Sequence, residues 1–127
     1  MRVCWLRRPV VREILQELNQ AVGVRGSAVV TRDGMLVASE LTAELDEDAV
    51  AAMASALVLN TISALERVGF GGFSLFTIRA SSGKMVVVDA EVAFLVVVTD
   101  PGVNLDLTMV DIRAASYRLQ KRGRLGL

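Results

Sequence analysis

The chain has 127 residues, enough for one domain with a single hydrophobic core and too few for two. Its 14 basic and 14 acidic residues cancel, so its overall charge gives no reason to expect a nucleic acid or an anionic membrane as the partner. Apolar residues make up 53% of the sequence and charged residues 22%, a balance that predicts surface made for burial against another protein.

The sequence offers few groups for catalysis. It contains no histidine, so the commonest general base and the commonest metal ligand are both missing. It also lacks the GxxxxGK[ST] pattern that cradles nucleotide phosphates, which argues against a GTPase. We therefore expect no catalytic residue, no cofactor and no bound metal. The single cysteine, Cys4, cannot form an internal disulfide and no signal peptide is apparent, so we expect a cytoplasmic protein.

A first helix is expected after a short tail of residues 1–8, in which Trp5 is a candidate to pack on that helix. Pro9 suits the first helical position, where its missing N–H would have no partner. Apolar residues then recur at helical spacing as far as Gly23, which ends the helix. They are Val10, Val11, Ile14, Leu15, Leu18, Ala21 and Val22.

An antiparallel hairpin is expected next, because the apolar period changes after Gly26. Residues 27–32 and 35–39 have strand patterns. Asp33-Gly34 between them is typical of a two-residue type I′ turn. Residues 41–45 then link the hairpin to a long helix.

The long helix spans residues 46–69. Asp46 is a favourable N-cap, and Gly69 can adopt the left-handed conformation that ends helices. No charged residue lies between Ala49 and Leu65, so no face of this helix is suited to open water. One side carries the residues expected to pack on a sheet: Val50, Ala54, Leu57, Val58, Thr61, Leu65 and Val68. The other side carries mostly small residues, which let a second helix approach closely: Ala49, Ala52, Ala56, Leu59, Asn60, Ser63 and Arg67.

A membrane span and a helix buried on all sides both fit this uncharged run less well than an interface does. A membrane span needs roughly 20 apolar residues, whereas the uncharged run is shorter and includes Asn60 and Ser63. A helix buried on all sides within one subunit needs more covering elements than a chain of this length provides. We therefore expect a protein–protein interface and no insertion into a membrane.

Three further strands and a last helix are expected after the long helix. The strands are residues 73–79, 84–89 and 93–99, and the last of them has the continuous apolar run that is typical of mid-sheet. Asn104 can cap the last helix, in which Leu105, Met109, Ile112, Ser116 and Leu119 recur at helical spacing before Gly123.

This order of elements predicts the fold class. Short turns join consecutive strands, so we expect an α+β domain with a five-stranded antiparallel sheet. The domain spans residues 9–122, and residues 123–127 form a second tail.

In this order the elements resemble the roadblock/dynein light chain domains, a family that includes bacterial GTPase regulators of the MglB type. The resemblance covers roughly residues 9–122. It rests on the element order, the alanine-rich long helix and three segments: residues 23–30 (GVRGSAVV) leading into Asp33-Gly34, residues 69–72 (GFGG), and residues 97–101 (VVTDP) running into the last helix.

The resemblance implies a profilin-like fold with helices on both faces of the sheet. It also implies a homodimer or heterodimer in which the third strands pair edge to edge, making one continuous sheet, and the long helices lie side by side. Family members commonly bind small Ras-like GTPases on a surface that includes the paired helices, and some stimulate GTP hydrolysis without contributing chemistry. The interface residues expected on this basis are Ala49, Ala52, Met53, Ala56, Leu59, Asn60, Ser63, Arg67, Phe73, Leu75, Phe76 and Ile78.

Further functions stay open from the residues alone. The same dimer without sensitivity to nucleotide would be a structural scaffold, and the many apolar residues also allow a small-molecule sensor. Arg67 or Arg25 could act as an arginine finger that stabilises charge in phosphoryl transfer. Asp46, Glu47 and Asp48 could bind a divalent cation, although a helix start explains these acidic residues better.

Overall fold

The computed structural model describes residues 8–125, so Cys4 and Trp5 of the predicted tail lie outside the described residues. The helices and strands follow the predicted order, which confirms the α+β fold. They are α1 (Arg8–Leu18), β1 (Val24–Val30), β2 (Leu36–Leu41), α2 (Glu47–Arg67), β3 (Leu75–Ala80), β4 (Gly83–Asp89), β5 (Phe94–Thr99) and α3 (Leu105–Leu125).

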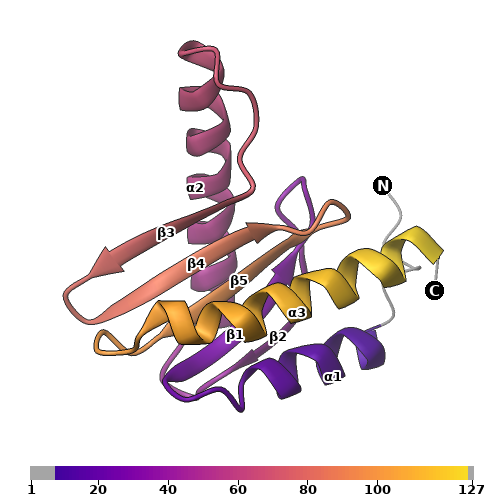
Figure 1. Ribbon diagram of the computed structural model, residues 1–127, viewed down its shortest axis with the longest axis vertical. Coiled ribbons are helices and arrows are strands. Elements are labelled where there is room, and N and C mark those ends of the chain that lie inside the picture. The colour runs from indigo at the N-terminus through magenta and orange to yellow at the C-terminus, as the bar shows by residue number, and fades with distance from the viewer. Residues whose placement is uncertain (1–7, 126–127) are drawn as a thin grey trace.

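The strands form one antiparallel sheet in the order β2-β1-β5-β4-β3 (Figure 1). β5 lies in the middle, as its continuous apolar run predicted, because such a strand can be buried on both faces. Within it, Val96 is paired with Ala28 of β1 and with Val87 of β4. β2 and β3 are the two edges of the sheet.

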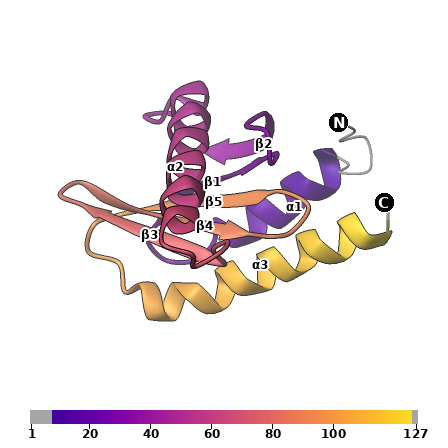
Figure 2. The same cartoon turned by 90° about the horizontal axis from the view of Figure 1, so that it is seen from above.

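The sheet is covered by α1 and α3 on one face and by α2 on the other (Figure 2). Successive side chains of a strand point to opposite faces. Leu95 and Val97 therefore pack toward α1 and α3, whereas Phe94 and Val96 pack toward α2. α1 and α3 contribute fully buried side chains to the first of these two cores: Val11, Ile14, Leu15, Ile112 and Leu119.

α1 ends at Leu18, earlier than predicted, and Val22 does not belong to its apolar stripe, because the Val22 side chain is 88% exposed. The side chain of Asn19 holds the end of the helix in place. Its amide nitrogen donates to the carbonyl of Glu40, and its oxygen accepts from the hydroxyl of Ser27, each at 2.7 Å. These bonds fix the chain on β1 and β2, so it leaves the helix before Val22.

The turn between β1 and β2 also differs from the prediction. Its central residues are Arg32 and Asp33, because the N–H of Gly34 donates to the carbonyl of Thr31 at 3.0 Å. Both central residues have negative φ, which excludes a type I′ turn, and Gly34 follows with a φ of +95°. The Asp-Gly pair thus predicts a turn correctly but not its type, since a glycine can also serve as the left-handed residue that closes a longer loop.

Several strand and helix boundaries also differ from the expected ones. β1 covers Val24–Val30 instead of residues 27–32, and β2 covers Leu36–Leu41 instead of residues 35–39. β3 begins at Leu75 rather than at Phe73. α3 continues to Leu125 instead of ending before Gly123. The predicted bounds of the domain, residues 9–122, stay a prediction.

Candidate interaction surface

α2 has well-defined ends, as its sequence predicted. A side-chain oxygen of Asp46 accepts from the N–H of Asp48 at 2.9 Å and from that of Ala49 at 3.2 Å, the geometry of an N-cap. At the other end the N–H of Gly69 donates to the carbonyl of Glu66, and the N–H of Phe70 donates to the carbonyl of Leu65. This is a Schellman motif, in which Gly69 has the required left-handed conformation, with a φ of +75°.

The first half of α2 packs most closely on the sheet, and from the second half the partly buried Ile62 also contacts the same core. The buried side chains of α2 are Val50, Ala51, Ala54 and Val58, and no residue after Val58 is buried. Figure 1 shows the later turns projecting beyond the strands. The prediction that Val68 packs on the sheet is therefore wrong: this side chain is exposed, because the helix leaves the sheet before reaching it.

α2 is long and apolar enough to cross a membrane, judged by length and composition. In this fold, however, its first half packs on the sheet of a folded domain. Its exposed second half is too short to span a bilayer, which needs roughly 20 residues. The uncharged exposed surface suits contact with protein, because a protein partner can also satisfy the amide of Asn60.

The predicted interface residues of α2 form one set on the side of the helix that faces away from the core, where Ala64 and Glu66 are exposed as well. We call this set the α2 face. All its members are exposed, and Arg67 is the only charged one among them. They are Ala49, Ala52, Met53, Ala56, Leu59, Asn60, Ser63 and Arg67.

The predicted interface residues of the third strand lie at the edge of the sheet. Within the described residues β3 pairs only with β4, so its outer edge carries N–H and C=O groups that no strand satisfies. Leu75, Phe76 and Ile78 are half-buried on this strand. Phe73 precedes it, and its ring stacks on that of Phe94 with centroids 5.8 Å apart. Phe73 therefore packs against the core on the α2 side of the sheet, although it lies next to the sheet edge.

A hollow of about 210 Å³ connects the α2 face with the β3 edge. Met53 and Leu57 line it from α2, and Ile78 lines it from β3. Met85 and Val98 form part of its apolar floor. The fold therefore brings the two predicted parts of the interface together around an apolar depression that a partner's side chains can enter.

Two exposed apolar residues at the projecting end of α2 were not among the predicted interface residues. They are Val68 and Phe70, the second of which is 76% exposed. Val68 shares its side of the helix with residues that do face the sheet, and Phe70 lies in a glycine-rich connection, so neither position gave a clear signal. An exposed phenylalanine next to an uncharged helix face extends the same apolar surface.

The two candidate arginine fingers have different surroundings. Arg25 donates to the carboxylate of Glu44 at 2.9 Å and lies 3.8 Å from that of Asp100, so it is held by acidic neighbours. Arg67 is exposed and has no ion pair within the described residues. Of the two, only Arg67 is free to meet a partner.

Two of the acidic residues at the start of α2 make hydrogen bonds within the folded chain. Asp46 caps the helix, and the carboxylate of Glu47 accepts a hydrogen bond from the hydroxyl of Ser39. Among residues 8–125 no three acidic, cysteine or histidine side chains gather as metal ligands would. The alternative of a divalent cation at Asp46, Glu47 and Asp48 thus gains no support.

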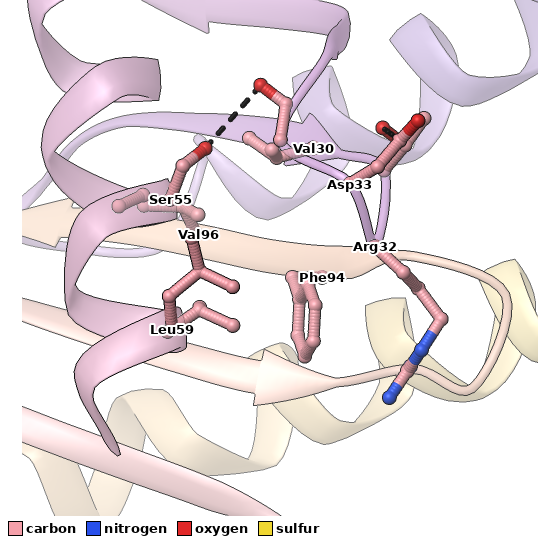
Figure 3. Close-up of a pocket in the computed structure, with 11 residues that line it drawn as sticks. Val30, Arg32, Asp33, Ser55, Leu59, Phe94 and Val96 are labelled. Atoms are coloured by element: carbon pink, nitrogen blue, oxygen red, sulfur yellow. Dashed lines mark hydrogen bonds between the residues drawn. The ribbon is translucent and has the colours of Figure 1, made fainter. Parts of the chain in front are cut away.

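A second, smaller pocket lies between α2 and the β1–β2 turn (Figure 3). Its volume is about 20 Å³, room for roughly one water molecule. The hydroxyl of Ser55 at its rim already donates to the carbonyl of Gly34 at 3.3 Å. Phe94 and Leu59 fill much of its wall. The pocket offers no space for the ligand of a small-molecule sensor.

Comparison with known proteins places the chain in a family. Residues 10–99 match the model of the Roadblock/LC7 domain. The chain belongs to this family. Two archaeal relatives from Methanocaldococcus jannaschii, the uncharacterized proteins MJ0714 and MJ1340, are 36% and 35% identical to it over 111 residues. The matched residues make up 87% of this chain in both cases, and 94% and 97% of the relatives.

Solved structures of Roadblock domains have the same fold. Myxococcus xanthus MglB is 18% identical and superposes with a TM-score of 0.84 over 92% of this chain and 90% of its own. A Roadblock/LC7 domain from Streptomyces avermitilis is 19% identical, with a TM-score of 0.76 over 86% of this chain and 93% of its own. Acanthamoeba castellanii profilin II is 20% identical, with a TM-score of 0.55 over 91% and 98% of the two chains. The profilin-like Roadblock fold predicted from the sequence is confirmed.

Proposed function

We propose that this Roadblock protein is a homodimer that binds and regulates a small Ras-like GTPase without taking part in its chemistry. The observation that carries the proposal is the α2 face, an exposed helix surface whose only charge is Arg67 and which lies beside the open edge of β3. An uncharged helix face of this length is costly to leave in water, so a protein surface is expected to cover it.

A second copy of the chain suits this surface for geometric reasons. An antiparallel pair of β3 strands related by a two-fold axis would satisfy the open edges of both sheets at once. The same axis would set the two α2 helices side by side. The small side chains of Ala52 and Ala56 then allow the two backbones to approach closely. Met53 and Leu57, which line the hollow between the two elements, would then be covered by the partner.

The GTPase is the partner that the family resemblance implies. In such a dimer the two-fold axis makes the α2 helices antiparallel, so the two projecting ends point in opposite directions, and each carries exposed Val68 and Phe70. These residues offer an apolar platform, and Arg67 beside them supplies a free positive charge. The chain has no histidine to act as a general base, so any effect on hydrolysis would come from reshaping or completing the site of the GTPase.

We also place this dimer in the cytoplasm. A chain with a single cysteine cannot form an internal disulfide, so its stability does not depend on an oxidising compartment. A small Ras-like GTPase would be met there.

The interface is tested by the substitution Ala56→Glu. A two-fold axis would bring two such carboxylates together in a dry seam, where neither charge has a partner. We expect the dimer to dissociate and the binding of the GTPase to fall at least tenfold. Ala43→Glu is the matched control, since it adds the same charge at an exposed position in the β2–α2 loop. A variant Ala56→Glu with unchanged mass in light scattering and unchanged binding would overturn the interface.

A further inference from the structure

α3 carries an apolar stripe on the side opposite the core. Leu107 is 73% exposed, Val110 is 71% exposed and Tyr117 is 58% exposed, and the small side chain of Ala114 is exposed between them. At 100° per residue these four positions fall on one side of the helix, while the buried Ile112 and Leu119 fall on the other. We call these four exposed residues the α3 stripe.

The α3 stripe is separate from the surface proposed to form the dimer. α3 covers the sheet face opposite to the one that α2 covers (Figure 2). Three large exposed apolar side chains in a row on one helix indicate a second interaction surface.

The stripe has a two-fold pattern. Leu107 and Tyr117 are large and lie at equal distances from its centre, and Val110 and Ala114 are smaller and lie at equal distances inside them. If a second α3 lies antiparallel across this centre, Leu107 of one copy meets Tyr117 of the other. Val110 of one copy then meets Ala114 of the other, which lets the helices approach closely.

The charges on α3 favour the same antiparallel arrangement. Its acidic residues, Asp106 and Asp111, lie in the N-terminal half, and Arg118 and Lys121 lie in the C-terminal half. In an antiparallel pair, Asp111 of one copy is on the same flank as Arg118 of the other, offset along the axis by about 7.5 Å, within reach of an arginine side chain. Asp106 and Arg113 have the same relation on the opposite flank. Arg118 already pairs with Glu17 of its own chain, so Asp111 would join this pair as a second acidic neighbour. A parallel pair would instead place the basic halves together.

We propose that a second copy of this chain docks on the α3 stripe, so that two α3 helices pair antiparallel about an axis near the middle of the stripe. This contact is independent of the α2 face. Because the two surfaces lie on opposite faces of the sheet, a chain that uses both assembles beyond a dimer.

The first test is the mass of the protein in solution as a function of concentration. We expect the wild type to exceed the mass of two chains at high concentration, and Val110→Glu to stop at two. Ala56→Glu is expected to be a monomer when dilute and to form a dimer through α3 only at high concentration, and the double variant is expected to be a monomer throughout. Ala43→Glu again serves as the control, and it should behave as the wild type does.

These outcomes separate the two proposals. If Ala56→Glu is dimeric and Val110→Glu is monomeric, the α3 contact stands and the α2 dimer fails. If Val110→Glu has the same mass as the wild type at every concentration, the α3 contact is overturned and the proposed function is untouched.

A second test determines whether the two α3 helices run parallel or antiparallel. In a Cys4→Ser background, Leu107→Cys and Tyr117→Cys are made separately, then oxidised alone and mixed. The antiparallel pair brings Cys at 107 to Cys at 117 of the other copy, so the mixture is expected to form a disulfide. Each variant alone is expected to form none, because its two equivalent cysteines lie about 15 Å apart, beyond the roughly 7 Å that a disulfide allows between Cα atoms. A disulfide in the single variants but not in the mixture, or none in any sample, would overturn the proposal.

Discussion

Arg32 and Asp89 join the two loops at one end of the sheet. One guanidinium nitrogen of Arg32 donates to the carboxylate of Asp89 at 2.8 Å, and the other donates to its second oxygen at 3.2 Å. The same guanidinium lies 4.7 Å from the centroid of the Phe94 ring, in a cation–π contact. Arg32 comes from the β1–β2 turn and Asp89 ends β4, so the pair fixes the rim of the pocket in Figure 3.

Breaking this pair should destabilise the fold modestly. Arg32→Met is expected to lower the free energy of unfolding by about 1 kcal/mol, because the pair is bidentate but partly screened by solvent. Asp89→Asn should cost a similar amount, and the double variant should cost less than the sum of the two. Urea unfolding of the four proteins measures the coupling. Additive losses would contradict a direct interaction.

The same pair makes a prediction about pH. The hydrogen bond from Arg32 to Asp89 raises the pKa of Arg32 above its usual value. Its contribution as a cation is therefore complete below the pKa of arginine in the unfolded chain and is lost only as the pH rises beyond the folded-state pKa. Across the neutral and mildly alkaline range, the stability difference between the wild type and Arg32→Met should stay constant in urea unfolding. A difference that fades in that range would contradict this.

Two glycines with positive φ should respond differently to alanine. Gly69→Ala is expected to cost about 1 kcal/mol, the strain of the left-handed conformation, because no atom lies within 4 Å of the added Cβ. Gly34→Ala meets the same strain, and its Cβ would also lie 3.0 Å from the hydroxyl oxygen of Ser55. Thermal unfolding should rank Gly34→Ala as the less stable variant. Adding Ser55→Ala should reduce the difference but not remove it, because the Cβ of residue 55 would still lie 3.3 Å from the added Cβ.

Neighbouring residues on α2 should separate folding from assembly. Val58 is buried, so Val58→Ala should lower the stability of the folded chain by about 2 kcal/mol. Leu59 is exposed on the α2 face, so Leu59→Ala should leave the stability of a diluted sample unchanged and weaken self-association. Unfolding at low concentration and light scattering at high concentration measure the two effects. A large loss of stability in dilute Leu59→Ala would mean that Leu59 belongs to the core.

The N-cap of α2 offers a further prediction. Asp46→Ala should cost about 1 kcal/mol, because it removes the acceptor for two backbone N–H groups. Asp46→Asn keeps that acceptor and should retain most of the stability. Chemical unfolding of the two variants beside the wild type measures both losses. If both variants lose the same amount, charge at the helix start outweighs the hydrogen bonds.

How much of this structure the sequence predicts depends on the element. The exposed face of α2 follows from the missing charges between Ala49 and Leu65, and every α2 residue predicted for the interface is exposed. The projecting end was not predictable, because helical periodicity gives the direction of a side chain but not how far the sheet beneath it extends. For this reason Val68 was placed on the sheet, although the helix passes beyond it.

The α3 stripe shows a second limit. The spacing of Ile112 and Leu119 indicates the buried side of the last helix, but the charges on the rest of it hide the apolar stripe. Leu107 and Tyr117 lie among those charges, so their alignment becomes visible only once the buried side is fixed. The β1–β2 turn illustrates a third limit, since the same Asp-Gly pair is compatible with two turn types.

The proposed function is tested most directly by measuring how the purified protein binds a small Ras-like GTPase from the same organism. The GTPase is loaded in turn with a GTP analogue and with GDP, and Ala56→Glu is measured beside the wild type. We predict strong preference for the GTP form, lost in the variant. Equal binding to both forms would favour a scaffold that does not sense nucleotide. No binding to either form would contradict the proposed function and leave the Roadblock fold standing.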